Sequence, residues 1–264
     1  MIQLSIVTVC RNSEKTIERC IKSILPCLTG EIEYLIVDGE STDETLNILK
    51  KYQSTYNFRV ISEKDSGIYN AMNKGARETN GEYIWYINSD DEVYPGAIEY
   101  LLSYLKNKSD KSDCYYGDMA YVREINGKRY EELKKASTDL ELLKRNMSIW
   151  HPSFICRREL LISQGGFDES FKIAADWDLI LRLYLHKSSF QYIPIVMARF
   201  SAGGASYAPP IKEKHLIRVK NKVVGLFDIY MIINYLDYFV QKICRILFPK
   251  FLDKKHIKKS KVLN

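Results

Sequence analysis

The sequence has few cysteines, and none of them form a recognisable motif. Six occur in 264 residues, and no two have the C-x-x-C spacing. Their positions are Cys10, Cys20, Cys27, Cys114, Cys156 and Cys244. This scatter gives neither the spacing of a zinc site nor a disulfide framework for so long a chain. We therefore expect buried, reduced thiols.

The first residues lack the features of a secretory signal. Residues 1–7 have no basic start, and no long apolar stretch with a small-residue cleavage site follows them. Their apolar character is instead typical of a buried strand. We therefore expect a cytosolic protein.

No glycine-rich phosphate loop follows any predicted strand. The G-x-G-x-x-G pattern is absent, which argues against a dehydrogenase that binds a dinucleotide. Residues 10–14, which follow the first apolar run, contain no glycine. This disfavours a sugar-phosphate nucleotidyltransferase, which needs a glycine-rich, basic loop at that position.

Excess positive charge is missing from most of the chain. The net charge is +6, but the segment from Lys242 to the C-terminus holds eight lysines or arginines against one aspartate. That segment therefore carries +7, which leaves −1 for everything before it. A near-neutral body excludes a nucleic-acid-binding face on the folded part, so we expect no nucleic-acid partner.

What the sequence does contain is a regular alternation of apolar runs and helical patterns. Hydrophobic residues make up 46% and aromatic residues 12%, enough for one main domain with an appendage. Strands are predicted at 4–9, 33–37, 58–62 and 83–87, with helices at 13–25, 41–52 and 69–79. Beyond Asp91 we expect a helix at 96–106, a strand at 114–123 and a helix at 175–185. Such alternation predicts an α/β fold with a parallel, doubly wound sheet, whose ligands bind beyond the carboxyl ends of the strands.

Carboxylates stand at three of these strand ends. Asp90 and Asp91 follow the apolar run 83–87, Asp38 precedes Gly39, and Asp65 precedes Gly67. Mg²⁺ and Mn²⁺ prefer oxygen ligands, and carboxylates at such positions also accept the N–H of a base or the hydroxyls of a ribose. Taken singly, each acid is equally explained by a solvated turn, an Asx-turn or a helix cap. Three clusters at successive strand ends favour a nucleotide and metal site.

With these motifs, the chain resembles the family 2 glycosyltransferases of the GT-A fold. It is most similar to bacterial enzymes that assemble surface polysaccharides of the colanic acid, capsule or O-antigen type. The resemblance covers about residues 3–200. It is carried by the segments 5–12 (SIVTVCRN), 37–43 (VDGESTD), 65–75 (DSGIYNAMNKG), 88–91 (NSDD), 165–171 (GGFDESF) and 175–179 (ADWDL). It implies a Rossmann-like, mostly parallel sheet flanked by helices.

The resemblance also implies roles for individual residues. The donor-binding residues would be Thr8, Arg11, Asp38, Asp65, Lys74 and Asp90, of which Thr8, Asp38 and Asp65 would line the nucleoside site. Asp90 and Asp91 would hold Mn²⁺ or Mg²⁺ on the donor diphosphate, and Asp176 would be the general base. Many relatives have an acid where this chain has Asn88 and Ala175. The Q-x-x-R-W signature of processive relatives is absent, so we expect one sugar to be added per encounter.

Two aromatic positions are candidates for contact with the acceptor. His151 precedes Pro152 in an aromatic-rich stretch, and Trp177 directly follows the expected base. A tryptophan or a histidine among apolar residues is equally explained as part of the core. Asp178 lies two residues after Asp176 and should point elsewhere, because positions i and i+2 do not share a helix face.

The C-terminal part predicts an amphipathic helix. Its apolar positions are Ile229, Ile232, Ile233, Leu236, Phe239, Val240, Ile243 and Leu247. Charges interrupt this stretch, so it is too short to cross a bilayer, which needs about 18 apolar residues. With the lysine-rich end, it favours a helix lying on anionic lipid at the inner face of the plasma membrane. The alternative is a helix packed on its own domain or on a second subunit.

These observations together predict a GT-A domain over residues 1–210 and a basic, membrane-associating helical extension over 211–264. The expected activity is metal-dependent, inverting transfer of one sugar from a nucleotide-sugar, with UDP favoured, to a lipid-linked or saccharide acceptor. The remaining alternatives are a sugar-phosphate nucleotidyltransferase and an inactive carbohydrate-binding protein of the same fold.

Overall fold

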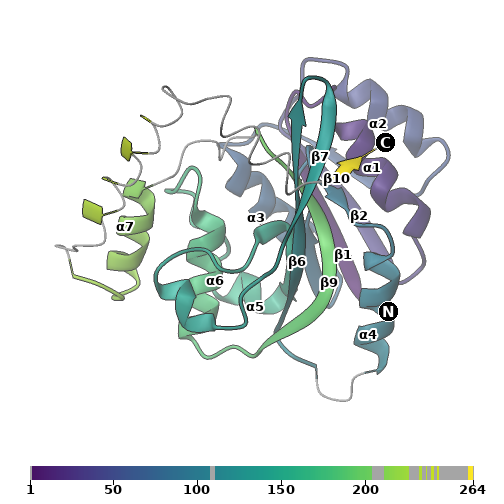
Figure 1. The fold of residues 1–264 in the computed structure, drawn as a ribbon. Coiled ribbons are helices and arrows are strands. Elements are labelled where there is room, and N and C mark those ends of the chain that lie inside the picture. Colours follow the sequence, from purple (N-terminus) through teal and green to yellow (C-terminus); the bar gives the residue numbers. More distant parts are fainter. Residues whose placement is uncertain are drawn as a thin grey trace.

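The computed structural model describes most of the chain. The described residues are 2–107, 111–203, 211–225 and 261–263, together with the helical residues Ile232, Ile233, Leu236, Phe239, Val240 and Ile243. In this part of the chain ten strands form one sheet with helices on both faces (Figure 1). The α/β architecture expected from the sequence is therefore confirmed.

The order of elements follows the predicted alternation in the first half of the chain. The strands are β1 (Leu4–Cys10), β2 (Ile32–Asp38), β3 (Arg59–Ser62), β4 (Tyr83–Tyr86), β5 (Glu92–Val93), β6 (Cys114–Ile125), β7 (Lys128–Lys134), β8 (Phe154–Arg157), β9 (Phe190–Ser201) and β10 (Lys261–Leu263). The α-helices are α1 (Ile17–Ile24), α2 (Thr45–Gln53), α3 (Ile68–Glu78), α4 (Ala97–Asn107), α5 (Arg158–Ser163), α6 (Ala175–Leu185) and α7 (Ile211–Lys220). Short 3₁₀ turns are η1 (Leu25–Cys27), η2 (Leu140–Lys144) and η3 (His151–Ser153).

The centre of the sheet is parallel, as the alternation predicts. Strands β4, β1, β2 and β3 lie side by side in that order and run in the same direction. The second half of the chain adds antiparallel pairs: β8 pairs with β4 and β6, and β7 pairs with β6. β9 runs parallel to β6 and antiparallel to β5. The parallel strands place their carboxyl ends at one edge, which is where the acidic motifs lie.

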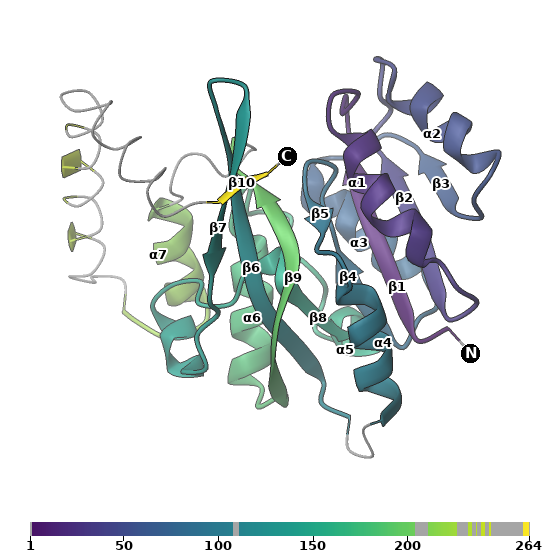
Figure 2. The same cartoon turned by 45° about the vertical axis from the view of Figure 1, so that its right-hand side comes forward.

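Helices cover both faces of the sheet, α1 and α4 on one and α3 and α6 on the other (Figure 2), and an apolar core lies under each layer. Side chains of β1 alternate between them, because successive residues of a strand point to opposite faces. Leu4 and Ile6 pack with α1 and α4, whereas Val7 and Val9 pack with α3 and α6. The α3 helix approaches β1 closely, since a Cβ on Gly75 would lie 2.5 Å from Val7 Cγ1.

Helix α7 packs on the body of the molecule. Ile217 is fully buried in the same core as α6. The expected boundary after residue 210 stays a prediction, although α7, which follows it, is joined to the preceding fold through this core.

The structure describes only part of the C-terminal segment. The six helical residues between 232 and 243 are all apolar and each is exposed, whereas the other positions of the predicted amphipathic helix lie outside the described residues. β10 pairs antiparallel with β7, with Val262 opposite Tyr130. No helix in the described part of the chain is long and apolar enough to cross a membrane.

Candidate active site

Three residues from three successive strand ends converge at the carboxyl edge of the sheet. A Cβ on Gly39 would lie 2.2 Å from Asp65 Oδ2 and 3.4 Å from Arg11 Cδ. Only a residue without a side chain allows Asp65 and Arg11 to approach the end of β2 this closely. Asp65 also accepts a hydrogen bond from the Gly67 N–H at 3.0 Å, which is the Asx-turn geometry. Gly67 has φ +141°, a conformation that favours glycine.

Asp38 and Thr8 lie deeper than the other expected donor-binding residues. The Asp38 carboxylate is fully buried and accepts hydrogen bonds from Ser62 Oγ at 2.7 Å and from the Ser41 N–H at 3.0 Å. Thr8 is also fully buried, and its hydroxyl lies 3.1 Å from the Tyr34 hydroxyl. Asp38 thus lies at the buried bottom of the site, and the Thr8 side chain points into the core beside α1.

Lys74 holds the segment that links β3 to α3. Its ammonium donates to the Lys64 carbonyl at 2.6 Å and pairs with Glu63 at 2.9 Å. The Lys74 ammonium thus binds the two residues that precede Asp65 in the sequence, and these contacts fix the backbone there. A direct contact between Lys74 and the donor stays a prediction.

The turn after β4 carries the expected metal-binding acids. Burial raises the pKa of Asp90, and burial together with the charge of Asp90 raises the pKa of Asp91 well above its usual range. Asp91 Oδ1 accepts a hydrogen bond from the Ser201 N–H at 2.9 Å. Among described residues, Asp91 Oδ2 and Asn88 Oδ1 are buried without a hydrogen-bond partner. Unpaired buried oxygens of this kind fit a hard cation, which prefers oxygen ligands.

Protein side chains alone do not complete a cation site there. Within the described ranges, no group of three or more histidines, cysteines, aspartates or glutamates is arranged to hold a metal ion. This agrees with the usual binding of Mg²⁺, in which one or two carboxylates and the phosphates of a substrate share the ion. An ion pair at the end of this turn fixes it in place: the buried Glu92 pairs with Arg19 at 2.8 Å.

Asp176 lies in the first turn of α6, beside the start of α3. Its Oδ1 accepts from the Trp177 N–H at 2.8 Å and lies 3.5 Å from the Tyr69 hydroxyl. Burial raises the pKa of Asp176 to about 6. The Tyr69 hydroxyl donates to the Ile173 carbonyl at 2.6 Å, so α3 supports the segment that precedes the acid.

The sequence motif at 65–75 is attached to the motif at 165–171 by side-chain amides. Asn73 donates to the Phe167 carbonyl and to Glu169, both at 2.9 Å, and accepts from the Phe167 N–H at 2.8 Å. Asn70 donates to Glu169 at 3.0 Å. These contacts connect the Asp65 region to the loop that leads into Asp176, so the two motifs form one site.

The two aromatic candidates for acceptor contact lie in the core. Trp177 is 1% exposed and its indole N–H donates to the Leu143 carbonyl at 2.8 Å. The indole offers no face to an acceptor, so the structure does not support that expectation. His151 stacks on Tyr86 and contacts Phe167 edge-on, and burial lowers its pKa to about 4. It is therefore a neutral member of an aromatic cluster that also includes Tyr69, which stacks on Phe167.

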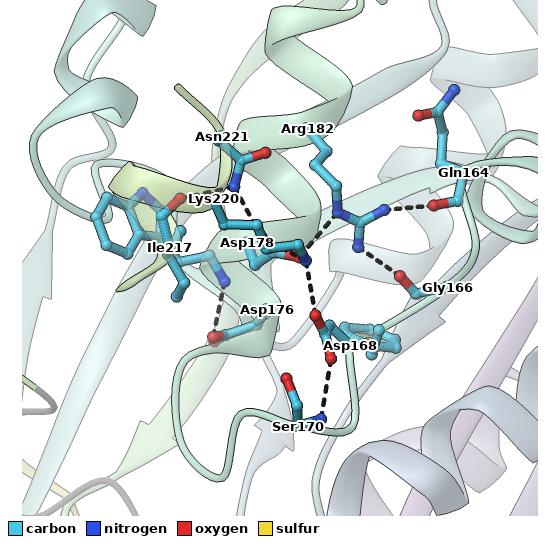
Figure 3. A network of polar contacts seen from close by, with 12 residues as sticks. Gln164, Gly166, Asp168, Ser170, Asp176, Asp178, Arg182, Ile217, Lys220 and Asn221 are labelled. Atoms are coloured by element: carbon cyan, nitrogen blue, oxygen red, sulfur yellow. Dashed lines mark hydrogen bonds and ion pairs between the residues drawn. The ribbon is translucent and has the colours of Figure 1, made fainter. Parts of the chain in front are cut away.

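Asp178 points away from Asp176, as expected for positions two residues apart. It is fully buried and pairs with Arg182 at 2.8 Å and with Lys220 at 3.1 Å (Figure 3). Arg182 also donates to the carbonyls of Gln164 and Gly166. Sequence reasoning missed the contribution of α7 to this region, because the pattern of α7 shows no apolar stripe that would have marked it as a packed helix.

Comparisons with known proteins agree with this geometry. The sequence profile described as glycosyl transferase family 2 matches residues 5–164. A PGL/p-HBAD biosynthesis glycosyltransferase of Mycobacterium bovis is 28% identical over 213 residues, which cover 79% of this chain and 81% of the relative. The chondroitin synthase of Escherichia coli is 31% identical over 177 residues, which cover 65% of this chain and 25% of that enzyme.

Solved structures with the same fold include two with bound nucleotide-sugars. Residues 1–349 of S. aureus TarS in complex with UDP-GlcNAc superpose with a TM-score of 0.66 at 21% identity, covering 87% of this chain and 69% of that one. The mannosyltransferase PcManGT of Pyrobaculum calidifontis, in complex with GDP-Man and Mn²⁺, gives a TM-score of 0.59 at 18% identity, covering 86% and 66%. At these identities the likeness concerns the fold.

Proposed function

The chain belongs to glycosyl transferase family 2, and from this premise we propose that it moves a single sugar from a nucleotide-sugar to an acceptor hydroxyl with inversion. A UDP-sugar is the favoured donor, since TarS, which shares the fold, binds UDP-GlcNAc. In this proposal Arg11 and Asp65 contact the nucleotide at the open strand ends. Asp38 and Lys74 shape that site, and Thr8 contributes from the core side of β1.

The observation that carries the proposal is the environment of Asp176. A carboxyl with a pKa of about 6 is largely ionised near neutral pH and remains basic enough to accept a proton from a hydroxyl. Its contact with Tyr69 and the amide contacts between the two motifs support a common site with the Asp65 region. In the proposed mechanism, Asp176 removes the proton of the acceptor hydroxyl as that oxygen attacks the anomeric carbon opposite the departing nucleotide.

We also propose that the enzyme depends on Mn²⁺ or Mg²⁺. Asp90 and Asp91 would hold the ion, with Asn88 Oδ1 as a further oxygen in the same turn. Such an ion, when bound, stabilises negative charge on the diphosphate of the leaving group. The buried, unpaired oxygen of Asp91 supports this assignment, because a buried charge without a partner is costly.

A lipid-linked oligosaccharide of a surface polysaccharide is the acceptor that we propose, with the protein peripheral on the cytoplasmic face of the membrane. The six exposed apolar residues between 232 and 243 support this, since their spacing places them on one side of a helix. They are 42% to 63% exposed, and the net charge of +7 from Lys242 onward suits anionic lipid.

Purified protein incubated with Mn²⁺ and single nucleotide-sugars tests the activity. We expect one donor to release its nucleoside diphosphate, and release to stop when the metal is chelated. Adding a lipid-linked saccharide should transfer the sugar with an inverted anomeric configuration, measured by NMR. Release of pyrophosphate, or binding of saccharides without donor turnover, would contradict the proposal and favour a nucleotidyltransferase or an inactive binding protein.

A further inference from the structure

Helix α7 is attached to α6 at its carboxyl end by a polar network around the buried Asp178 (Figure 3). Lys220 Nζ lies 2.7 Å from Asp168 Oδ2 and 3.1 Å from Asp178 Oδ2, and Asn221 Nδ2 donates to Asp178 Oδ1 at 2.9 Å. Ile217 packs in the core between these contacts and the start of α7. α7 is therefore held on α6 by interactions that do not include its first turn.

The first turn of α7 contacts the segment that precedes the base. Glu213 accepts hydrogen bonds from three successive backbone N–H groups, those of Lys172 at 2.8 Å, Ile173 at 3.0 Å and Ala174 at 3.0 Å. Ala174 is the N-cap residue of α6 and provides no side-chain cap. Glu213 thus accepts from the N–H of the N-cap residue, as the N3 glutamate of a capping box does, but from another helix.

The same segment is fixed from the opposite side by α3. The Tyr69 hydroxyl donates to the Ile173 carbonyl at 2.6 Å. The three backbone N–H groups of residues 172–174 and the Ile173 carbonyl are therefore all hydrogen-bonded to side chains. Asp176 follows two residues after this segment. The orientation of Asp176 depends on this segment, because the first helical turn begins there.

We propose that Glu213 is a positioning residue for Asp176. The inference rests on the proposed role of Asp176 as the general base. It adds α7, which follows the segment matched by the family profile, to the catalytic unit. Glu213 acts through the backbone of residues 172–174 and does not contact the reacting atoms.

The groups that act on Asp176 come from α3 and α7. They are the Tyr69 hydroxyl, 3.5 Å from Asp176 Oδ1, and the Glu213 carboxylate. Burial raises the pKa of Asp176 most, and the negative charge of Glu213 raises it further. Burial lowers the pKa of Lys214, the residue after Glu213, and the charge of Asp176 acts on it in the opposite direction. Neutralising Glu213 should therefore lower the pKa of Asp176.

The isosteric variant Glu213→Gln tests the inference by the dependence of kcat on pH. In the wild-type enzyme kcat should fall below about pH 6, because a protonated Asp176 cannot accept the proton. Glu213→Gln removes a negative charge, so this acidic limb should move to lower pH. Lys212→Gln, an exposed position in the same turn, should leave the limb unchanged and is the matched control.

Glu213→Gln should also lower kcat at the optimum by about 10- to 100-fold, the order expected when a reacting group is misplaced by an ångström. The KM for the donor should stay unchanged, because Glu213 accepts hydrogen bonds from residues 172–174, which are not among the residues proposed to bind the donor. A Glu213→Gln enzyme with the kcat and acidic limb of Lys212→Gln would overturn the inference. The inference would also be overturned if kcat fell only because the variant is less stable, as shown by a lower Tm, while the acidic limb stayed at the wild-type pH.

Glu213→Gln introduced into the Asp176→Asn variant distinguishes failure of the base assignment from failure of the positioning role. If Asp176 is the base, Glu213→Gln should cause little further loss of transfer in that background, because both changes act on one group. If Asp176→Asn retains full transfer, the base is elsewhere and the proposed mechanism fails. If Asp176→Asn is inactive while Glu213→Gln behaves as wild type, only the positioning role fails.

Discussion

Two acids two residues apart in α6 have different surroundings. Asp178 is fully buried and paired with Arg182 and Lys220, so its charge is neutralised by the protein. Asp176 forms no ion pair with any residue in the described ranges, and burial raises its pKa to about 6. A carboxyl that is partly desolvated and free of a direct cation partner is suited to take up a proton. Asp178 is suited to hold α7 in place.

We predict that Asp176→Asn lowers the rate of sugar transfer by roughly 10²–10⁴, the usual contribution of a positioned general base. The amide keeps the size of the side chain but cannot accept the proton. Donor affinity, measured by calorimetry, should stay close to wild type. Asp139→Asn, at the exposed N-cap of η2, is the matched control and should leave transfer unchanged. Lost donor binding in Asp176→Asn would instead assign Asp176 to the nucleotide site.

We predict that Asp91→Asn abolishes metal-dependent turnover and raises the Tm of the metal-free protein. The amide retains an oxygen for the Ser201 N–H, while the change removes a carboxyl whose ionised form is disfavoured by burial and by the charge of Asp90. Each kcal/mol of relief corresponds to about 2–4 °C in a protein of this size. Thermal unfolding with and without Mn²⁺ checks this. A variant still stabilised by Mn²⁺ to the wild-type extent would contradict the metal assignment.

At the residue scale, the sequence predicts which acids reach the site better than it predicts side-chain direction. Asp65 and Asp90 follow apolar runs, so their positions at strand ends follow from chain order, and Asp176 lies in the first turn of the expected helix. Thr8 and Trp177 turn into the core. The face that a strand or helix residue points to depends on register and on packing with distant elements, which neighbouring residues in the sequence do not determine.

At the element scale, the end of β2 and the β3–α3 segment approach each other closely at the proposed donor site. Gly39 is the point of contact, because a Cβ there would lie 2.2 Å from Asp65 Oδ2. Asp65 is a partly exposed side chain and has room to move away, so the conflict should displace Asp65 more than it unfolds the sheet.

We therefore predict that Gly39→Ala raises the Kd and KM for the donor by roughly tenfold, which corresponds to about 1.4 kcal/mol. The Tm should change little. Gly30→Ala is the control, since a Cβ at Gly30 meets nothing within 4 Å. Donor affinity equal in the two variants would show that Asp65 does not contact the nucleotide.

The elements that the sequence predicts well are those stabilised by local pattern. The helix expected at 175–185 has the same bounds as α6, and the four parallel strands are found within one or two residues of their predicted ends. Strands β8 and β9 were not predicted, because their pairing with β4 and β6 joins segments distant in sequence. Helix α7 lies within the helical extension expected over 211–264, but the sequence does not predict that it packs on α6. Its attachment relies on Glu213, Lys220 and Asn221 in place of an apolar stripe.

At the scale of the whole molecule, a group of exposed apolar residues and the excess of positive charge both lie in the C-terminal part of the sequence. The body before Lys242 carries a net charge of −1, and the exposed apolar residues 232–243 lie next to the strongly basic end of the sequence. An amphipathic helix beside a basic segment associates with anionic membranes through two additive contributions. Each lysine near the surface contributes about 1 kcal/mol, and the apolar face adds its own burial.

We predict that the protein pellets with anionic liposomes at low salt, and that high salt weakens this binding without abolishing it, because screening affects only the electrostatic part. Leu236→Gln combined with Phe239→Gln should reduce pelleting and leave donor turnover unchanged, since both side chains are 63% exposed. Leu133→Gln, 59% exposed on β7, is the matched control for loss of a surface apolar group. Truncation after Gly225 should keep α7 and donor turnover but remove pelleting altogether. If the full-length protein ignores anionic liposomes at low salt, or if truncation unfolds the catalytic domain, the segment packs on protein and the membrane proposal fails.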